Sequence, residues 1–385
     1  MLIYLLVFLI STLLIYIANK INDSVGTRIR KKILYYVIVT IALLIPSILA
    51  GMRDFSIGTD VLVYGNAWFQ NALQMVNFQI YSAWATSSSI GYLYAAINFV
   101  VSRFTNDPHV LYFYISLLEN VFVYWAIRRQ KDWLNAPYAM LVYFLLFYNY
   151  NLNILRQGLA TVVILWGFKY VREQKLIKYI LTVWVACGFH NTAYFGIVIY
   201  LVYWIATNKI SKNLKYLLIV GFVLGLAFFK KIAGLLLAHG ILGDRYIGYI
   251  DGSVARGGFF TQLLLSLPIL VYALVVTLGK ENSKLHGVFY LVILGSMMSV
   301  LNLNTAFLSR LTQYINFMYI IFWPILIQNS NIRFTGYNIE GSRKIVYVVV
   351  TFYLLIYWYI IYVYMKSGQT VPYIIDPMYG HLFQW

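Results

Sequence analysis

Long apolar runs separated by short polar connections dominate the chain, and this pattern predicts membrane-spanning helices. A transmembrane helix needs about 20 predominantly apolar residues, and several runs approach that length. The clearest predicted spans are about Leu2–Ala18, Ile33–Ala50, Leu111–Ile127, Thr261–Leu278, Val288–Leu303, Leu311–Ile327 and Ile345–Met365. With the shorter runs included, we expect an all-α, polytopic membrane bundle of about twelve membrane-embedded helical segments, forming one integral membrane domain over residues 1–385.

Two apolar stretches are too short or too interrupted to be simple spans. Ile90–Val101 is short for a crossing, so we expect it to re-enter the membrane or to lie against the bundle. The stretch Tyr179–Ala206 is interrupted by GFHN at 188–191, and lysines flank both of its ends. A down-and-up pair of short helices meeting at His190 fits this flanking, because broken helices are tolerated where they line a cavity. The pattern leaves open whether either stretch crosses the membrane.

Composition and charge set the class of protein and its expected orientation. The chain is 62% hydrophobic and 11% charged, whereas a soluble protein carries about 25% charged residues. Basic residues cluster at 20–32, 128–131 and 172–178, which places these connections in the cytoplasm by the positive-inside rule. The first run has neither a basic preceding segment nor a cleavage site, so we expect a retained span. The prediction is a multi-pass plasma-membrane protein with external segments at about 52–88, 230–260 and 366–385.

Four arginines fall at the predicted outer ends of spans, where the positive-inside rule predicts few basic residues. They are Arg53, Arg156, Arg245 and Arg310. A guanidinium is planar and its forked donors suit phosphate oxygens. If the four converge on one cavity, they would hold a strongly anionic group, and a pyrophosphate is the natural candidate. The alternative is that each is an isolated side chain that reaches the membrane surface.

Polar and aromatic side chains accompany each of these arginines. Arg156 lies in the polar stretch Asn149–Ala160, between the apolar runs Pro137–Tyr148 and Leu159–Tyr170, and a charge at membrane depth costs about 2.5 kcal/mol or more. Helical spacing places Asn153 beside Arg156, and Tyr314 beside Arg310. The predicted substrate-binding residues are Arg53, Thr59, Tyr64, Asn153, Gln157, Arg245, Tyr246, Tyr249, Arg310 and Tyr314.

Asp60 and His190 are the candidate proton acceptors, and Arg156 is the third predicted catalytic residue. Asp60 follows a glycine turn at Gly58, and it is expected to be either a general base or an ion-pair partner of Arg53. Because nearby cations lower the pKa of a carboxyl group, we expect Asp60 to be ionised and to orient Arg53. His190 lies at a helix break and titrates near neutral pH, so we favour His190 as the base.

Metal, disulfide and nucleotide chemistry have no counterpart in the sequence motifs. The chain has a single cysteine, Cys187, which excludes an intramolecular disulfide. It contains no HExxH sequence, no paired DxD carboxylates and no Walker loop. We therefore expect no metal, no cofactor and no ATP-driven transport.

The order of these motifs resembles the EpsG branch of the Wzy-like polysaccharide polymerases. The similarity lies in Arg53 with Gly58-Thr59-Asp60, in Asn153 with Arg156-Gln157, and in His190. The sequence Val-Pro-Tyr at 371–373 is similar to the external tail of that family. The resemblance extends from the second span to the helix that carries Arg310. It implies that the family's arginines match Arg53, Arg156, Arg245 and Arg310, and that the family's histidine matches His190.

The resemblance also implies a function at the outer leaflet of a bacterial plasma membrane. Such proteins polymerise lipid-linked oligosaccharide repeat units for capsule, exopolysaccharide or surface antigen. Polyprenyl pyrophosphate is the leaving group, and neither a nucleotide sugar nor a tightly held metal is used. The expected partners are these lipid-linked units, membrane lipid, a flippase and a chain-length regulator, with no nucleic acid. The alternatives are a lipid-linked glycan translocator and a glycosyltransferase similar to O-antigen ligase.

Overall fold

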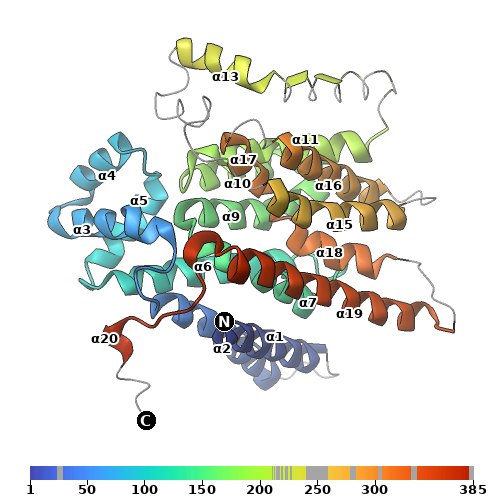
Figure 1. Cartoon of the computed structure of the whole chain (residues 1–385), viewed down its shortest axis with the longest axis horizontal. Coiled ribbons are helices and arrows are strands. Elements are labelled where there is room, and N and C mark those ends of the chain that lie inside the picture. Colours follow the sequence, from blue (N-terminus) through green and yellow to red (C-terminus); the bar gives the residue numbers. More distant parts are fainter. Residues whose placement is uncertain are drawn as a thin grey trace.

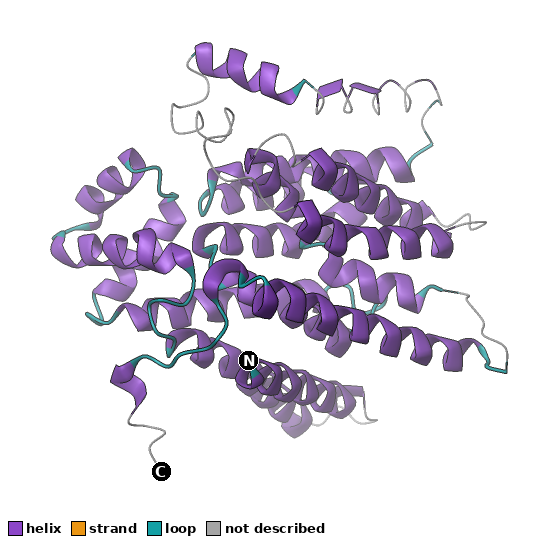
Figure 2. Cartoon of the chain, in the orientation of Figure 1, coloured by secondary structure: helices purple, strands orange, loops and turns teal. Residues whose placement is uncertain are grey.

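The computed structural model describes residues 1–23, 29–209, 228–239, 259–277, 283–301, 306–330 and 336–380, with single residues between 210 and 228. In this described part of the chain every regular element is a helix, which confirms the all-α class (Figure 2). The long helices lie roughly side by side in a bundle, and α3, α4 and α5 gather at one end of it (Figure 1).

Five described helices are long and apolar enough to cross a membrane, as expected of a membrane protein. They are α1 (Leu2–Asp23), α2 (Ile29–Gly51), α6 (Pro108–Arg128), α15 (Phe259–Thr277) and α19 (Ile339–Trp358), the last extended by a π-helical segment, Tyr359–Tyr364. The total of about twelve membrane-embedded segments remains a prediction.

Shorter helices make up the rest of the described structure. Those in the bundle are α7 (Ala136–Tyr143), α8 (Asn149–Asn151), α9 (Leu155–Arg172), α10 (Leu176–Cys187), α11 (Gly196–Thr207), α16 (Ser283–Leu301), α17 (Ala306–Asn316) and α18 (Tyr319–Gln328). The others are α3 (Asn66–Gln74), α4 (Phe78–Ser87), α5 (Tyr92–Ser102), α13 (Phe229–Ala238) and α20 (Pro377–Gly380). A π-helical turn, Phe144–Tyr148, joins α7 to α8. Thus α13 is helical where an external segment was predicted.

Helix α9 lies in the middle of the bundle, in contact with α6, α10 and α17. Most of its side chains are buried, and small residues bring its neighbours close. A Cβ atom at Gly167 would lie 2.7 Å from Cγ2 of Thr182 on α10. Close packing therefore fixes the helix whose first turn carries Arg156.

The predicted break near His190 is present in the structure. Helix α10 ends at Cys187, a 3₁₀ turn covers Asn191–Phe195, and α11 follows directly. The start of α5 is attached to this break, because the Leu93 amide donates to the Gly188 carbonyl at 2.8 Å. The expectation of two short helices that meet at His190 is thus confirmed for the fold.

The prediction of one uninterrupted span over Leu311–Ile327 is wrong, because α17 and α18 are separate helices. The chain tightens where they meet, and the Met318 amide donates to the Ile315 carbonyl at 2.9 Å. Just before this turn, the buried Asn316 side chain donates to Oε1 of Gln262 at 2.9 Å. A polar residue that pairs with another helix is compatible with an apolar run, so hydropathy alone did not reveal the break.

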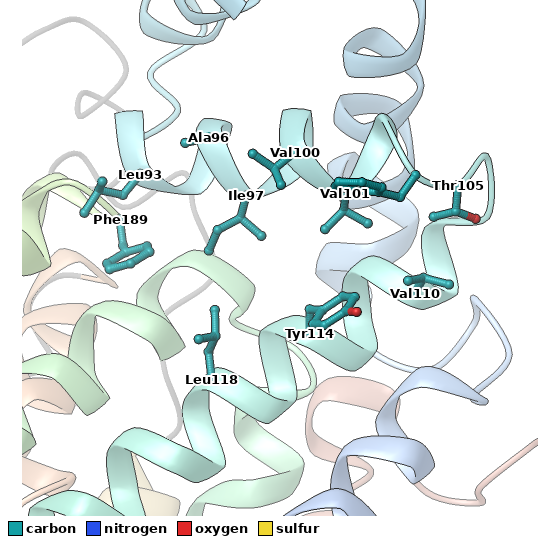
Figure 3. A pocket seen from close by; sticks show the side chains of 11 residues that line it. Leu93, Ala96, Ile97, Val100, Val101, Thr105, Val110, Tyr114, Leu118 and Phe189 are labelled. Atoms are coloured by element: carbon teal, nitrogen blue, oxygen red, sulfur yellow. The ribbon is translucent and has the colours of Figure 1, made fainter.

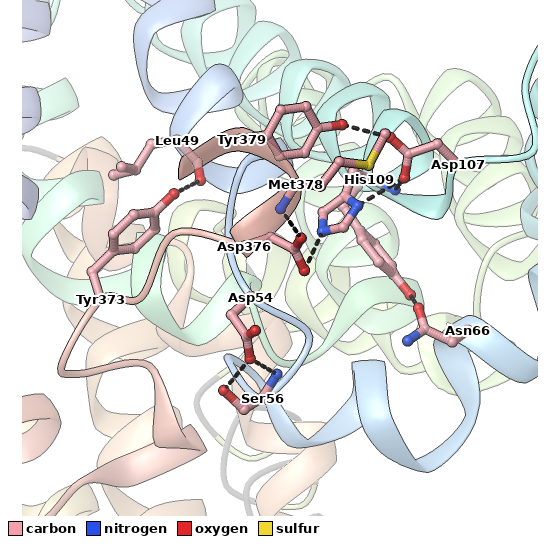
Figure 4. Close-up of polar contacts among 11 residues, drawn as sticks. Leu49, Asp54, Ser56, Asn66, Asp107, His109, Tyr373, Asp376, Met378 and Tyr379 are labelled. Atoms are coloured by element: carbon pink, nitrogen blue, oxygen red, sulfur yellow. Dashed lines mark hydrogen bonds and ion pairs between the residues drawn. The ribbon is translucent and has the colours of Figure 1, made fainter. Parts of the chain in front are cut away.

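A C-terminal strap, Thr370–Gly380, returns to the end of the bundle that carries α3–α5 (Figure 1). The Asp54 amide donates to the Ile374 carbonyl at 2.9 Å, and the Asp376 amide donates to the Met52 carbonyl at 3.0 Å. His109 lies between two carboxylates, 2.7 Å from Asp107 and 3.4 Å from Asp376 (Figure 4). These contacts tie the segment after α2 to the strap, so we call this end of the molecule the polar end.

Basic side chains gather at the opposite end of the bundle. Arg128 at the end of α6 donates to Asn19 near the end of α1 at 3.3 Å. Arg172 at the end of α9 lies over the Trp133 ring, 5.3 Å from its centroid. By the positive-inside rule, we predict that this end faces the cytoplasm.

We expect an impermeant maleimide to label cysteines at the polar end of intact cells and to leave the basic end unlabelled. Ser56→Cys and Ser88→Cys, both at exposed positions, test the polar end, and the exposed Lys131→Cys tests the basic end, each in a Cys187→Ser background. Labelling of Lys131→Cys before permeabilisation, with protection of the other two, would reverse the orientation.

Candidate active site

The site begins at a glycine turn that packs against the segment before α9. Gly58 has φ +89°, and a Cβ atom there would lie 2.5 Å from the Leu152 carbonyl oxygen. This close approach brings Thr59 to Asn153, and the Thr59 hydroxyl donates to Asn153 Oδ1 at 2.6 Å. The Asp60 amide donates to the same oxygen at 3.3 Å. Two motifs that are far apart in the sequence thus form one polar unit.

Arg156 lies beside this unit on an aromatic platform, which consists of Tyr64 and Trp68. The two rings are stacked with centroids 4.2 Å apart, and the guanidinium lies 5.3 Å from the Tyr64 ring and 4.4 Å from the Trp68 ring. Nη1 of Arg156 donates to the Ser89 carbonyl at 3.0 Å. The Tyr64 hydroxyl donates to the Asp60 carboxylate, so the platform connects Arg156 to Asp60.

A second arginine reaches Asp60 from α17. Gln157 fixes α17 to α9, because its side-chain amide donates to the Arg310 carbonyl at 2.6 Å. The charges of Arg310 and Arg156 both act on the Asp60 carboxyl group. The Asp60 carboxyl group is therefore within electrostatic reach of two guanidinium groups that come from different helices.

The electrostatics of Asp60 differ from the prediction. Burial raises the pKa of the Asp60 carboxyl group to about 7, and the nearby Arg310 and Arg156 only partly offset this increase. Desolvation of the buried carboxyl group therefore outweighs the two cations. The expectation of a lowered pKa was therefore wrong, and Asp60 titrates in the range that suits a general base.

His190 belongs to a hydrogen-bond chain that runs to α17. Its Nδ1 atom lies 2.7 Å from the Thr192 hydroxyl, which lies 3.0 Å from the hydroxyl of the buried Tyr314. Tyr314 is one helical turn after Arg310. The chain therefore joins the helix break to the helix that supplies the second arginine.

Arg53 is separated from this cluster and is buried, with 1% of its surface exposed. Its guanidinium lies 5.2 Å from the centroid of the Tyr112 ring, and its backbone bridges to Ile375 in the strap. The arginines that act on Asp60 are Arg310 and Arg156, so the predicted pairing of Asp60 with Arg53 was wrong. Arg53 lies where it can hold the strap in place.

The remaining predictions fall partly outside the structure. Arg245, Tyr246 and Tyr249 lie outside the described residues. Within the described residues no group of three or more His, Cys, Asp and Glu side chains could hold a metal ion. Sequence reasoning missed Trp68, although its spacing of four residues from Tyr64 would place both rings on one helix face.

We expect Gly58→Ala to lower the melting temperature and the activity more than Gly336→Ala does. Both glycines have a positive φ, but only Gly58 has a backbone carbonyl where the new methyl group would lie, and Gly336 faces open space. Gly336→Ala should therefore lose only about 1 kcal/mol from backbone strain. Equal melting temperatures for the two variants would show that the close approach at Leu152 is unimportant.

Comparison with known proteins gives one match. No curated protein and no solved structure shows significant similarity to the chain. The family model described as the EpsG family matches residues 36–375, a range that runs from α2 into the strap and includes every residue of the site. The chain therefore belongs to the EpsG family.

Proposed function

We propose that this protein is a Wzy-like polymerase that joins polyprenyl-pyrophosphate-linked oligosaccharide repeat units at the outer leaflet. The family membership supports the broad class of polymerase. The observation that carries the proposal is that the Asp60 carboxyl group is bonded to Tyr64 of the platform under Arg156, and that the charges of Arg156 and Arg310 both act on it. A proton acceptor beside two forked cations matches a reaction that removes a proton and expels a pyrophosphate.

In the proposed reaction, a hydroxyl group of one lipid-linked unit attacks the anomeric carbon of the growing chain. A new carbon–oxygen bond forms as the bond to the pyrophosphate oxygen breaks. Arg156 and Arg310 bind the departing pyrophosphate, on which negative charge increases in the transition state. Asp60 accepts the proton of the attacking hydroxyl group. Polyprenyl pyrophosphate leaves, and the glycan is longer by one repeat unit.

Other residues of the site are proposed to position these groups. Thr59 and Asn153 hold the Asp60 turn, and Gln157 holds the helix of Arg310. Tyr64 and Trp68 orient the Arg156 guanidinium, which restricts its fork before substrate arrives. Tyr314 and His190 brace the same helix from the other side through Thr192.

We assign the base role to Asp60 in place of His190. The charges of Arg156 and Arg310 both act on Asp60, whose pKa is near 7, whereas His190 is part of the hydrogen-bond chain through Thr192 to Tyr314. His190→Gln, which keeps a hydrogen-bonding side chain, should therefore lower turnover by less than about tenfold, well below the 10²–10⁴-fold typical of a lost base. Turnover of the purified variant would be measured beside its melting temperature. A loss as large as that of Asp60→Asn would return the base role to His190.

The polymerase function is tested with purified protein and a synthetic polyprenyl-pyrophosphate-linked repeat unit. The expected products are a ladder of glycans and free polyprenyl pyrophosphate, formed without nucleotide sugar or added metal. Glycan transferred to a separate acceptor, without a ladder, would indicate a ligase. Movement of intact lipid-linked units across a proteoliposome membrane, with neither product, would indicate a translocator. In cells, a flippase would supply the substrate and a chain-length regulator would act on the product.

A further inference from the structure

An apolar groove lies between α5 and α6 at the polar end of the bundle (Figure 3). Its volume is about 580 Å³, which is within the range of small-molecule sites. Leu93, Ile97 and Val101 of α5 form one wall, and Tyr114 and Leu118 of α6 form the other. Phe189 lines the end next to the helix break. The groove is lined almost entirely by carbon atoms, so an apolar chain fits it.

One end of the groove lies next to the helix break at His190. Phe189, which forms this end, directly precedes His190. The wall helix α5 is fixed to the same break through the bond from the Leu93 amide to the Gly188 carbonyl. The segment just before α5 also holds Arg156, because the Ser89 carbonyl accepts from its guanidinium. Short chain segments therefore connect this end of the groove to the residue that binds Arg156.

The other end of the groove opens toward exposed apolar side chains. Val100 is 54% exposed and Phe104 is 85% exposed, and both line this part of the groove. A ligand that fills the whole path has an anionic head at Arg156 and Arg310 and a long apolar chain that leaves toward the lipid. This combination of charge and shape describes a lipid diphosphate.

We propose that the groove between α5 and α6 holds the part of the isoprenoid chain nearest the diphosphate of the lipid-linked substrate. This inference rests on the proposed polymerase function for the identity of the head group. The groove determines how far the isoprenoid chain enters the protein, and the arginines determine the position of the diphosphate. Together they place the anomeric carbon at Asp60.

The test uses a groove-filling variant, Ala96→Trp, and a matched control, Val271→Trp. Ala96 lines the groove, whereas Val271 is an exposed apolar residue of α15, away from it. Binding of radiolabelled long-chain polyprenyl diphosphate and of a short-chain analogue that ends before the groove would be measured on purified protein. We expect Ala96→Trp to weaken binding of the long chain by roughly 5- to 150-fold, the range for overfilling a packed apolar space. Ala96→Trp should bind the short analogue as tightly as wild type does. Val271→Trp should bind both ligands as tightly as wild type does.

Photocrosslinking supplies a second measurement that needs no substitution. A long-chain diphosphate with a photoreactive group near its head should label peptides of α5 and the peptide that contains Phe189. Equal binding of the long chain by Ala96→Trp and wild type, or labelling confined to other helices, would overturn the proposal. So would loss of co-purified phospholipid from Ala96→Trp with polyprenyl diphosphate binding unchanged, because the groove would then hold ordinary membrane lipid.

Failure of the groove can be distinguished from failure of the polymerase function. Binding of bare polyprenyl diphosphate requires no glycan and no turnover. If wild type makes no polymer but binds the long chain in the groove, the proposed polymerase function is wrong and the proposed groove site is supported. If wild type makes polymer, and Ala96→Trp binds the long chain and turns over normally, the proposed groove site is wrong and the polymerase function is supported.

Discussion

Asp60→Asn is expected to reduce turnover by about 10²–10⁴-fold, the usual contribution of a general base, while the fold stays intact. The amide has nearly the same shape as the carboxyl group and can still accept from the Tyr64 hydroxyl, but it cannot take a proton. Polymer formation by purified protein measures the effect. The matched control is Asp54→Asn, which removes a carboxylate six positions earlier that accepts from the Ser56 amide and hydroxyl, and it should keep nearly full activity.

The pH dependence gives a second signature of the same residue. Only ionised Asp60 can accept a proton, so kcat/KM of the wild type should rise with pH through about 7 and then level off. The folded protein holds this proton more tightly than the unfolded chain, so the stability linked to Asp60 is greatest below about pH 4 and is lost as pH rises through 7. At pH 8, Asp60→Asn should therefore melt at a higher temperature than wild type. An active Asn variant with an unchanged pH profile would remove Asp60 from the mechanism.

Arg156→Lys is expected to lose about 10²–10³-fold in turnover, nearly as much as Arg156→Ala. Lysine keeps the charge but lacks the planar fork, which here both donates to the Ser89 carbonyl and stacks on the Tyr64–Trp68 platform. A compact ammonium group has donors for both acceptors, but it cannot stack on the platform or present two parallel donors to the pyrophosphate. The measurement is turnover together with binding of the lipid-linked donor.

The chain contains a close structural control for this substitution at the basic end. Arg129 also stacks on a Trp–Tyr pair, 4.0 Å from the Trp166 centroid and 4.6 Å from the Tyr170 centroid, and it donates to a backbone carbonyl. Arg129→Lys should reproduce any loss of stability without the loss of turnover. If both lysine variants are equally active, bidentate recognition of pyrophosphate by Arg156 is wrong.

The sequence predicted the structure correctly where a single local pattern determines the position of a helix or of a helix break. The spans at α1, α2 and α6 followed from uninterrupted apolar runs, and the break at His190 followed from GFHN. The contact between Thr59 and Asn153 was not predicted, because the two residues are far apart in the sequence and only the fold brings them together.

The sequence did not reveal which polar side chains are buried. Arg53 and Arg156 look alike in the sequence, yet Arg53 is enclosed by aromatic side chains and the strap, whereas Arg156 reaches Asp60. Arg103 is a further example, because it lies at the polar end and its guanidinium binds the Ala72 and Met75 carbonyls at the end of α3. The pKa of Asp60 likewise depends on desolvation by distant segments, which no spacing rule reports.

The strap has a consequence for the order in which the protein is made. Tyr4 donates to the Thr370 carbonyl at 2.7 Å, and Asn149 donates to the Thr370 hydroxyl at 3.2 Å, so Thr370 joins three distant parts of the chain. Synthesis proceeds from the N-terminus, and residues 370–376 therefore leave the ribosome after every described helix of the bundle. Until then the segment that leads to Asp60 lacks its partners Ile374 and Ile375. In a nascent chain that is already inserted in the membrane, the arginines of the site would be present but the segment that carries Asp60 would not yet be held by the strap. Activity would therefore begin only after translation is complete.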